Sequence, residues 1–165
     1  MKKIIMLIAF TICVLLCSCG KQAAPSDIMA RVVTELEDVP GSRIIFYSDA
    51  NPDTESFMKP EAIAAIYYDG FEINSLCEEY AVFMGSSDCP FEIHILKSRA
   101  TSNMPEILSA LQMRKDILQS KNAASYAPDS YDVTMAAKVF SKGKYAILLV
   151  TKDNEKAEKV IQKFI

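Results

Sequence analysis

The sequence predicts an α+β fold: a four-stranded antiparallel sheet with helices packed on one face, preceded by two N-terminal helices. Three observations carry this prediction. Apolar residues recur with helical spacing in several segments, they alternate with polar residues in others, and short turn-forming runs join the alternating segments in pairs. The core order reads ββαββα, and helices on one face of the sheet would bury their apolar stripes. Residues 26–165 are expected to form this single domain.

The first helix is expected to begin at Ser26, which can cap it, and to run to about Glu37. Asp27 is favourable at its positive N-terminal end. Pro40-Gly41 ends this helix, and Ile44–Tyr47 is expected to form a short extended piece before a polar loop.

A second helix and a first hairpin follow. Pro60 suits the first turn of a helix that runs to Tyr68. Strands Tyr80–Gly85 and Phe91–Lys97 flank a turn-rich connector. The second strand alternates in a way that predicts one buried face and one wetter face, the wetter one carrying Glu92, His94 and Leu96.

The longest helix is expected to open at Asn103, where Glu106 three residues later completes a capping box, and to fade near Ser120. A second hairpin and a closing helix should follow: Asp132–Phe140, Lys144–Thr151 and a helix capped by Asp153 or Asn154.

Residues 1–18 read as a lipoprotein signal peptide. Two lysines precede the 13-residue apolar run Ile4–Leu16, which is shorter than the roughly 20 residues of a spanning helix. Of the three cysteines here, Cys19 alone follows a small residue, Ser18, which the signal peptidase pocket requires. We expect Cys19 to be the lipid-modified N-terminus and residues 19–25 to form the lipidated tether. An uncleaved anchor and an ordinary secretory signal are the alternatives.

A lipoprotein signal peptide predicts a protein that is anchored by acyl chains such as palmitate on the extracellular or periplasmic side of the cell membrane. Each buried methylene adds about 0.8 kcal/mol, so two chains anchor stably. The formal net charge of −3 becomes −5 once Lys2 and Lys3 leave with the signal peptide. That mild acidity argues against nucleic acid as a partner and against a polybasic hold on anionic lipid.

The two cysteines of the domain, Cys77 and Cys89, are expected to be unpaired. With a hairpin turning near Asp88, Cys77 lies some eight residues from the turn. At about 3.3 Å per residue, the two α-carbons would be over 20 Å apart, beyond the reach of a disulfide.

Arg114 is the most unusual position, because it falls on the apolar stripe of the longest helix. A buried guanidinium must be paired. Glu92 is the candidate partner, and the carbonyl groups of the Lys121–Pro128 loop, which contains Tyr126, are a second one. The clamp is expected to be structural. An arginine that binds a carboxylate or phosphate ligand is the alternative.

Four oxygen-bearing side chains at alternate positions mimic the first half of a calcium loop: Asp49, Asn51, Asp53 and Glu55. Thr54 stands where the sharp turn needs glycine, and Pro60 stands where a bidentate glutamate belongs. A solvated acidic loop is the expected reading. His94 is the only histidine, and no Cys-x-x-Cys or phosphate-loop motif is present, so no metal centre and no cofactor are expected.

The stretch from about Tyr67 to Phe164 resembles a bacterial lipoprotein family catalogued as domain of unknown function 4358. The residues that carry the resemblance are Glu78-Glu79-Tyr80, Glu92, Arg114, Tyr126-x-Pro128 and Gly143-Lys144-Tyr145. The resemblance implies a signal-anchored domain, commonly of Gram-positive bacteria, with no established activity. It supplies no catalytic residue.

Three classes of function follow from these observations. The first is a non-enzymatic envelope module that binds a protein or a glycan outside the membrane. The second is an envelope hydrolase that uses Glu92 and neighbouring carboxylates, which would require a pocket where Glu92, His94 or Arg114 converge. A calcium-steadied structural domain is a third reading.

Overall fold

The computed structural model describes residues 22–41, 43–67, 71–86, 89–120 and 131–165. The expected signal peptide, Cys19 and Tyr126 lie outside the described residues. Within those residues, no helix is both long enough and apolar enough to cross a bilayer.

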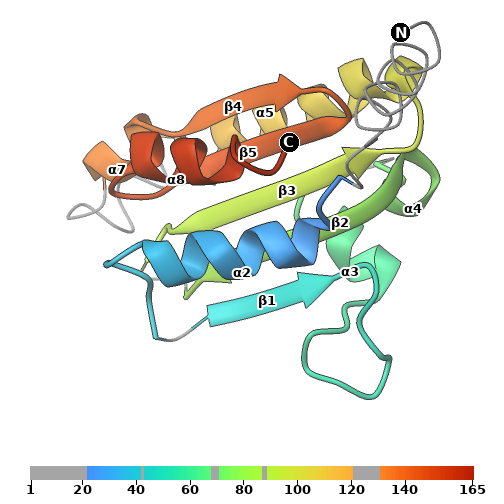
Figure 1. The fold of residues 1–165 in the computed structure, drawn as a ribbon, viewed down its shortest axis with the longest axis horizontal. Coiled ribbons are helices and arrows are strands. Elements are labelled where there is room, and N and C mark those ends of the chain that lie inside the picture. The colour runs from blue at the N-terminus through green and yellow to red at the C-terminus, as the bar shows by residue number, and fades with distance from the viewer. Residues whose placement is uncertain (1–21, 42, 68–70, 87–88, 121–130) are drawn as a thin grey trace, which may run out of the picture.

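The sheet is antiparallel, as predicted, but it has five strands rather than four. Their spatial order is β1-β2-β3-β5-β4 (Figure 1). The strands are β1 (Arg43–Tyr47), β2 (Cys77–Gly85), β3 (Glu92–Ser98), β4 (Lys138–Lys142) and β5 (Tyr145–Val150). The additional strand, β1, is the segment expected to be a short extended piece, and it pairs with β2 from Arg43↔Gly85 to Tyr47↔Ala81.

The helices only partly follow the expected boundaries. They are α2 (Pro25–Glu35), α3 (Pro60–Ala64), α4 (Ile73–Leu76), α5 (Met104–Leu118), α7 (Tyr131–Met135) and α8 (Asn154–Ile161), with a 3₁₀ turn at Thr101–Asn103. Two short helices, α4 and α7, were not expected. α7 occupies the first residues of the expected strand Asp132–Phe140, because alternation over so few residues does not distinguish a strand from a single helical turn.

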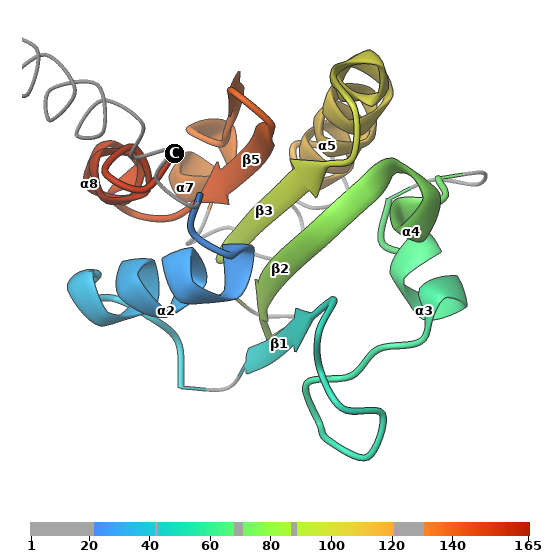
Figure 2. The same cartoon turned by 45° about the vertical axis from the view of Figure 1, so that its right-hand side comes forward.

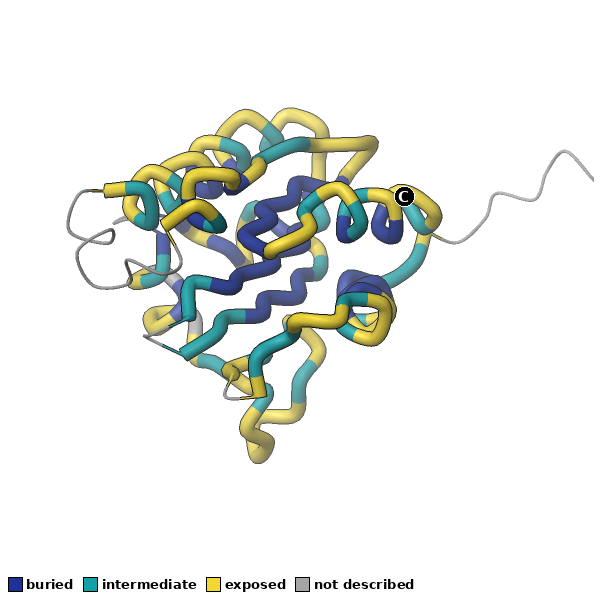
Figure 3. Tube along the Cα trace, turned by 90° about the vertical axis from the view of Figure 1, so that its left-hand side faces the viewer, coloured by how far each residue is buried: buried dark blue, intermediate teal, exposed yellow. Residues whose placement is uncertain are grey.

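Helices cover both faces of the sheet, so the prediction of helices on one face is wrong. On one face lie α2 and α8, and on the other lie α3, α4 and α5 (Figure 2). The expected wetter face of β3 is therefore covered as well, and Glu92, His94 and Leu96 are all buried. Figure 3 shows the buried strands running through the middle of the molecule.

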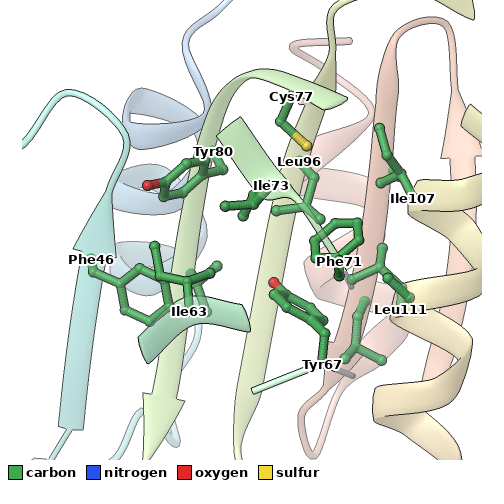
Figure 4. Packing of buried hydrophobic residues seen from close by; sticks show 14 of the residues in the cluster. Phe46, Ile63, Tyr67, Phe71, Ile73, Cys77, Tyr80, Leu96, Ile107 and Leu111 are labelled. Carbon is green, nitrogen blue, oxygen red and sulfur yellow. The ribbon is translucent and has the colours of Figure 1, made fainter. Parts of the chain in front are cut away.

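Each face of the sheet has its own apolar core. Beneath α2 and α8, the core includes Ile28, Val32, Phe83, Ile95, Ile147 and Ile161. On the α5 side it includes Phe46, Tyr67, Phe71, Leu96, Ile107 and Leu111 (Figure 4). Alternate residues of β3 and β5 point into the two cores, which is why both strands are buried almost throughout.

The helix caps differ in how well local sequence predicted them. Asp153 caps α8 as expected, since its carboxylate accepts from the Lys156 amide at 2.8 Å. The capping box at Asn103 does not form, and the Asn103 side-chain amide instead donates to the Leu76 carbonyl at 3.2 Å. In α2, Ala24 takes the cap position expected for Ser26, with Pro25 in the first turn.

Cys77 and Cys89 are both free, as predicted. Cys77 opens β2 opposite Ser98, and the hairpin closes with Met84 opposite Glu92. Burial raises the pKa of the Cys77 thiol to about 12, so this thiol stays protonated at neutral pH.

Candidate functional site

Four polar side chains form one hydrogen-bonded chain under α5, which we call the buried polar line: Tyr67, His94, Glu92 and Arg114. Glu92 and His94 are two residues apart on β3, so the pleat places both on the face that α5 covers. Arg114 comes from α5 itself, and Tyr67 comes from the segment after α3. Three parts of the chain therefore meet at this point.

The ion pair expected between Arg114 and Glu92 is present and has two contacts. The Arg114 Nε donates to Glu92 Oε2 at 3.0 Å, and Nη2 donates to Glu92 Oε1 at 2.5 Å. A third guanidinium nitrogen, Nη1, donates to the Ile66 carbonyl at 3.4 Å. Such bidentate, charge-assisted bonds fix geometry as well as charge. The arginine fork is thus occupied by groups of the protein itself.

His94 links the ion pair to Tyr67. Its Nε2 lies 3.0 Å from Glu92 Oε2, and its Nδ1 lies 3.0 Å from the Tyr67 hydroxyl oxygen. Burial lowers the pKa of His94 despite the neighbouring carboxylate, which favours the neutral ring. A neutral ring satisfies both bonds when Nε2–H donates to Glu92 and Nδ1 accepts from Tyr67.

The charges on the buried polar line balance. Burial alone would raise the pKa of Glu92, but the hydrogen bonds from His94 and Arg114 outweigh burial and hold that pKa below its usual value. Burial raises the pKa of Tyr67 well above its usual value. One carboxylate therefore faces one guanidinium, with a neutral imidazole and a neutral phenol beside them, and every donor described here has an acceptor.

The order carboxylate, imidazole, hydroxyl is that of a catalytic relay. A relay must also touch its substrate. Here Tyr67 is 2% exposed, His94 0% and Glu92 4%, and Phe71 packs edge-on against the Tyr67 ring at 4.9 Å between centroids. Within the described residues the line acts as a clamp that joins β3, α5 and the end of the α3 segment.

Three surface hollows are lined by residues outside the buried polar line. One of about 110 Å³ lies between Leu36, Phe91 and Asp153. A groove of about 500 Å³ runs between α2 and Phe164. A hollow of about 10 Å³ adjoins Ala24 and Asp49. Among the described residues, none of these three hollows is lined by Glu92, His94 or Arg114, where the hydrolase hypothesis needs a pocket.

The acidic loop after β1 is exposed and ordered by its own backbone. The Asn51 side chain accepts from the Asp53 amide at 3.0 Å, which is an Asx turn, and the Thr54 hydroxyl donates to the Asn51 carbonyl. Asp49, Asp53 and Glu55 do not converge, and no group of three or more acidic, histidine or cysteine side chains among the described residues is placed to hold a metal ion.

Sequence reasoning found the ion pair and missed the rest of the line. His94 was expected on a wetter face, and its complete burial corrects that prediction. Tyr67 fell inside an expected helix, where an aromatic residue indicates core and nothing singles out its hydroxyl. The available signal was the spacing Glu92-x-His94 on a strand that the Arg114 helix was expected to cover.

Comparison of the chain with protein-family models, with curated proteins and with solved structures finds no match.

Proposed function

We propose that the protein is a lipid-anchored domain on the outer side of the cell membrane, where it works by binding an envelope protein or a glycan and not by catalysis. The proposal joins the N-terminal sequence, which has the features of a lipoprotein leader, to a folded body that begins a few residues after Cys19. The resemblance to the lipoprotein family of unknown function supports the same assignment.

The buried polar line is the observation that favours binding over catalysis. The side chains best suited to acid–base or nucleophilic chemistry are Tyr67, Glu92 and His94. All three are withdrawn from solvent and bonded to one another. Their arrangement is explained by the stability of the fold, so binding has to use other parts of the surface.

Metabolic labelling with a clickable fatty acid tests the anchor. We expect the native chain to take up label and Cys19→Ser to take up none. The matched control is Cys17→Ser, which removes a neighbouring cysteine that follows the bulky Leu16 and should label like the native chain. Equal labelling of Cys19→Ser and the native chain would remove the basis for the proposed location.

Crosslinking in intact envelopes tests binding against a ligand role for Arg114. At a temperature where Arg114→Ala is still folded, it should capture the same partners as the native protein. Lys115→Ala, which removes a positive charge from the same helix, is the control. A partner lost from the folded Arg114→Ala variant alone would show that Arg114 binds a ligand.

A further inference from the structure

The point where the chain enters the folded body is fixed by a buried side chain. Tyr145, at the start of β5, is 0% exposed, and its hydroxyl donates to the Ala23 carbonyl at 2.7 Å. Pro25, two residues later, is buried at the start of α2. The path of the chain is therefore defined from Ala23 onward.

Very little chain separates this point from the lipid. The inference rests on the proposed function, in which Cys19 carries the acyl groups. Only Gly20, Lys21 and Gln22 lie between Cys19 and Ala23. Four residue steps span at most about 14 Å when fully extended, so Ala23 has to stay within that distance of the lipidated residue.

Ala23 lies at one particular end of the sheet. Tyr145 pairs with Lys97 at the end of β3, and the β4–β5 turn at Lys142–Lys144 lies beside it. We call this end, with Ala23, the tether end (Figure 1). The opposite, far end holds Val150 paired with Glu92, together with the hollow between Leu36, Phe91 and Asp153. Along β5 the two ends are about 17 Å apart.

We propose that the tether end lies against the lipid headgroups of the membrane that holds Cys19, and that the far end faces away from it. A link of about 14 Å cannot pass round a body whose sheet is longer than the link itself. The hollow at the far end is then the part of the surface most open to an envelope partner.

The short link, and not charge attraction, sets this orientation. Lys144 lies 3.9 Å from the Glu78 carboxylate, and Lys97 lies 2.8 Å from the Glu79 carboxylate. Asp49 adjoins Ala24 at the same end. Because these lysines lie beside carboxylates, zwitterionic lipid should serve as well as anionic lipid.

The test uses the full-length lipidated protein in phosphatidylcholine vesicles that contain a little lipid with a nitroxide on its headgroup. A fluorophore is attached at Lys144→Cys or at Lys152→Cys, each in a Cys89→Ser background so that no other accessible thiol remains. The two lysine side chains are 47% and 65% exposed and lie at the tether end and the far end. We expect strong quenching at position 144 and none above the nitroxide-free control at position 152.

Two variants test the cause. A flexible Gly/Ser insert of about 20 residues after Gly20 has a root-mean-square end-to-end distance near 25 Å. With this insert, quenching at position 144 should no longer exceed quenching at position 152. Tyr145→Phe removes only the hydroxyl that binds the Ala23 carbonyl. It should reduce the difference in quenching between positions 144 and 152.

The outcomes separate the two proposals. A vesicle-bound protein with equal quenching at both positions, or stronger quenching at 152, would overturn the orientation and leave the anchor standing. A protein that does not float with the vesicles would overturn the proposed function, and the orientation with it.

Discussion

Arg114 and Glu92 show how much a single residue can matter to this fold. The Arg114 and Glu92 side chains are 16% and 6% exposed, so their attraction is only weakly screened by water. Removing one partner leaves the other charge buried and unpaired, which costs more than the pair itself contributes.

We expect Arg114→Ala to lower the free energy of unfolding by about 3–5 kcal/mol, because it strands the Glu92 carboxylate. The combination of Arg114→Ala with Glu92→Gln should cost less than the sum of the two single changes, since a neutral amide can still accept from His94. Urea denaturation of the four proteins in the cycle measures this. Strict additivity would mean that the ion pair is not coupled.

His94 should make stability depend on pH. Its pKa is lowered in the folded state, so below about pH 6.5 the unfolded chain binds a proton that the folded protein does not bind. The free energy of unfolding therefore decreases as the pH is lowered. The lowered pKa of Glu92 adds a further loss below about pH 4.5. The chain has one histidine, so the slope of unfolding free energy between pH 5 and 6.5 reports on His94.

His94→Gln should flatten that slope, whatever it does to stability at neutral pH. Denaturation midpoints of both proteins, measured between pH 5 and 7.5, decide the matter. A native protein whose midpoint does not change from pH 7.5 to 5 would contradict the neutral, buried state of His94.

At the scale of the element, the β2–β3 hairpin depends on a close backbone approach at Gly85. A Cβ added there would lie 2.5 Å from the Cys89 carbonyl oxygen and 3.2 Å from that of Phe91. Both neighbours are backbone atoms, and the Gly85 amide donates to the Phe91 carbonyl at 2.7 Å, so the hairpin has to shift to make room.

Gly85→Ala should therefore lower the unfolding free energy by about 1–3 kcal/mol. Gly41→Ala is the matched control, because nothing lies within 4 Å of an added Cβ there, and its effect should stay within about 0.5 kcal/mol. Thermal melts of the two variants measure the difference, and equal melting temperatures would be evidence against the close backbone approach at Gly85.

The elements set by neighbouring residues could be predicted from the sequence. The two hairpins and the Asp153 cap of α8 each depend on a few consecutive residues. The clamp was within reach as well, because an arginine on an apolar stripe needs a partner. These features are local, or they follow from a strong energetic requirement.

What the sequence could not specify is long-range pairing. β1 pairs with β2 across a segment that contains α3 and α4, and nothing within Arg43–Tyr47 identifies β2 as its partner. Both α2 and α5 bury apolar residues, but neither set of residues shows which face of the sheet the helix covers. Glu92 and His94 are polar and suggest a wet face. Their burial is possible because Glu92 and His94 are hydrogen-bonded to each other. The alternation of polar and apolar residues along the strand does not reveal this bond.

At the scale of the whole molecule, β3 and β5 form the most protected part of the fold. Each has a strand on both sides, and apolar clusters cover both faces of the sheet. β1 and β4 are edge strands, and β4 is partly exposed.

The backbone amides of the five strands should therefore differ in their rates of native-state hydrogen exchange. Those of β3 and β5 should open only with global unfolding, and those of β1 and β4 should exchange faster through local opening. Mass spectrometry of deuterated peptides gives the order. A β1 segment that outlasts β3 would contradict this view of where stability is concentrated.

The separation of Cys77 from Cys89 has one more consequence. Within the part of the chain that the structure describes, no disulfide crosses the fold, so its stability does not depend on an oxidant or a thiol isomerase. Reductants such as dithiothreitol should leave its melting temperature unchanged, and the body should refold from urea equally well in reducing and in oxidising buffer.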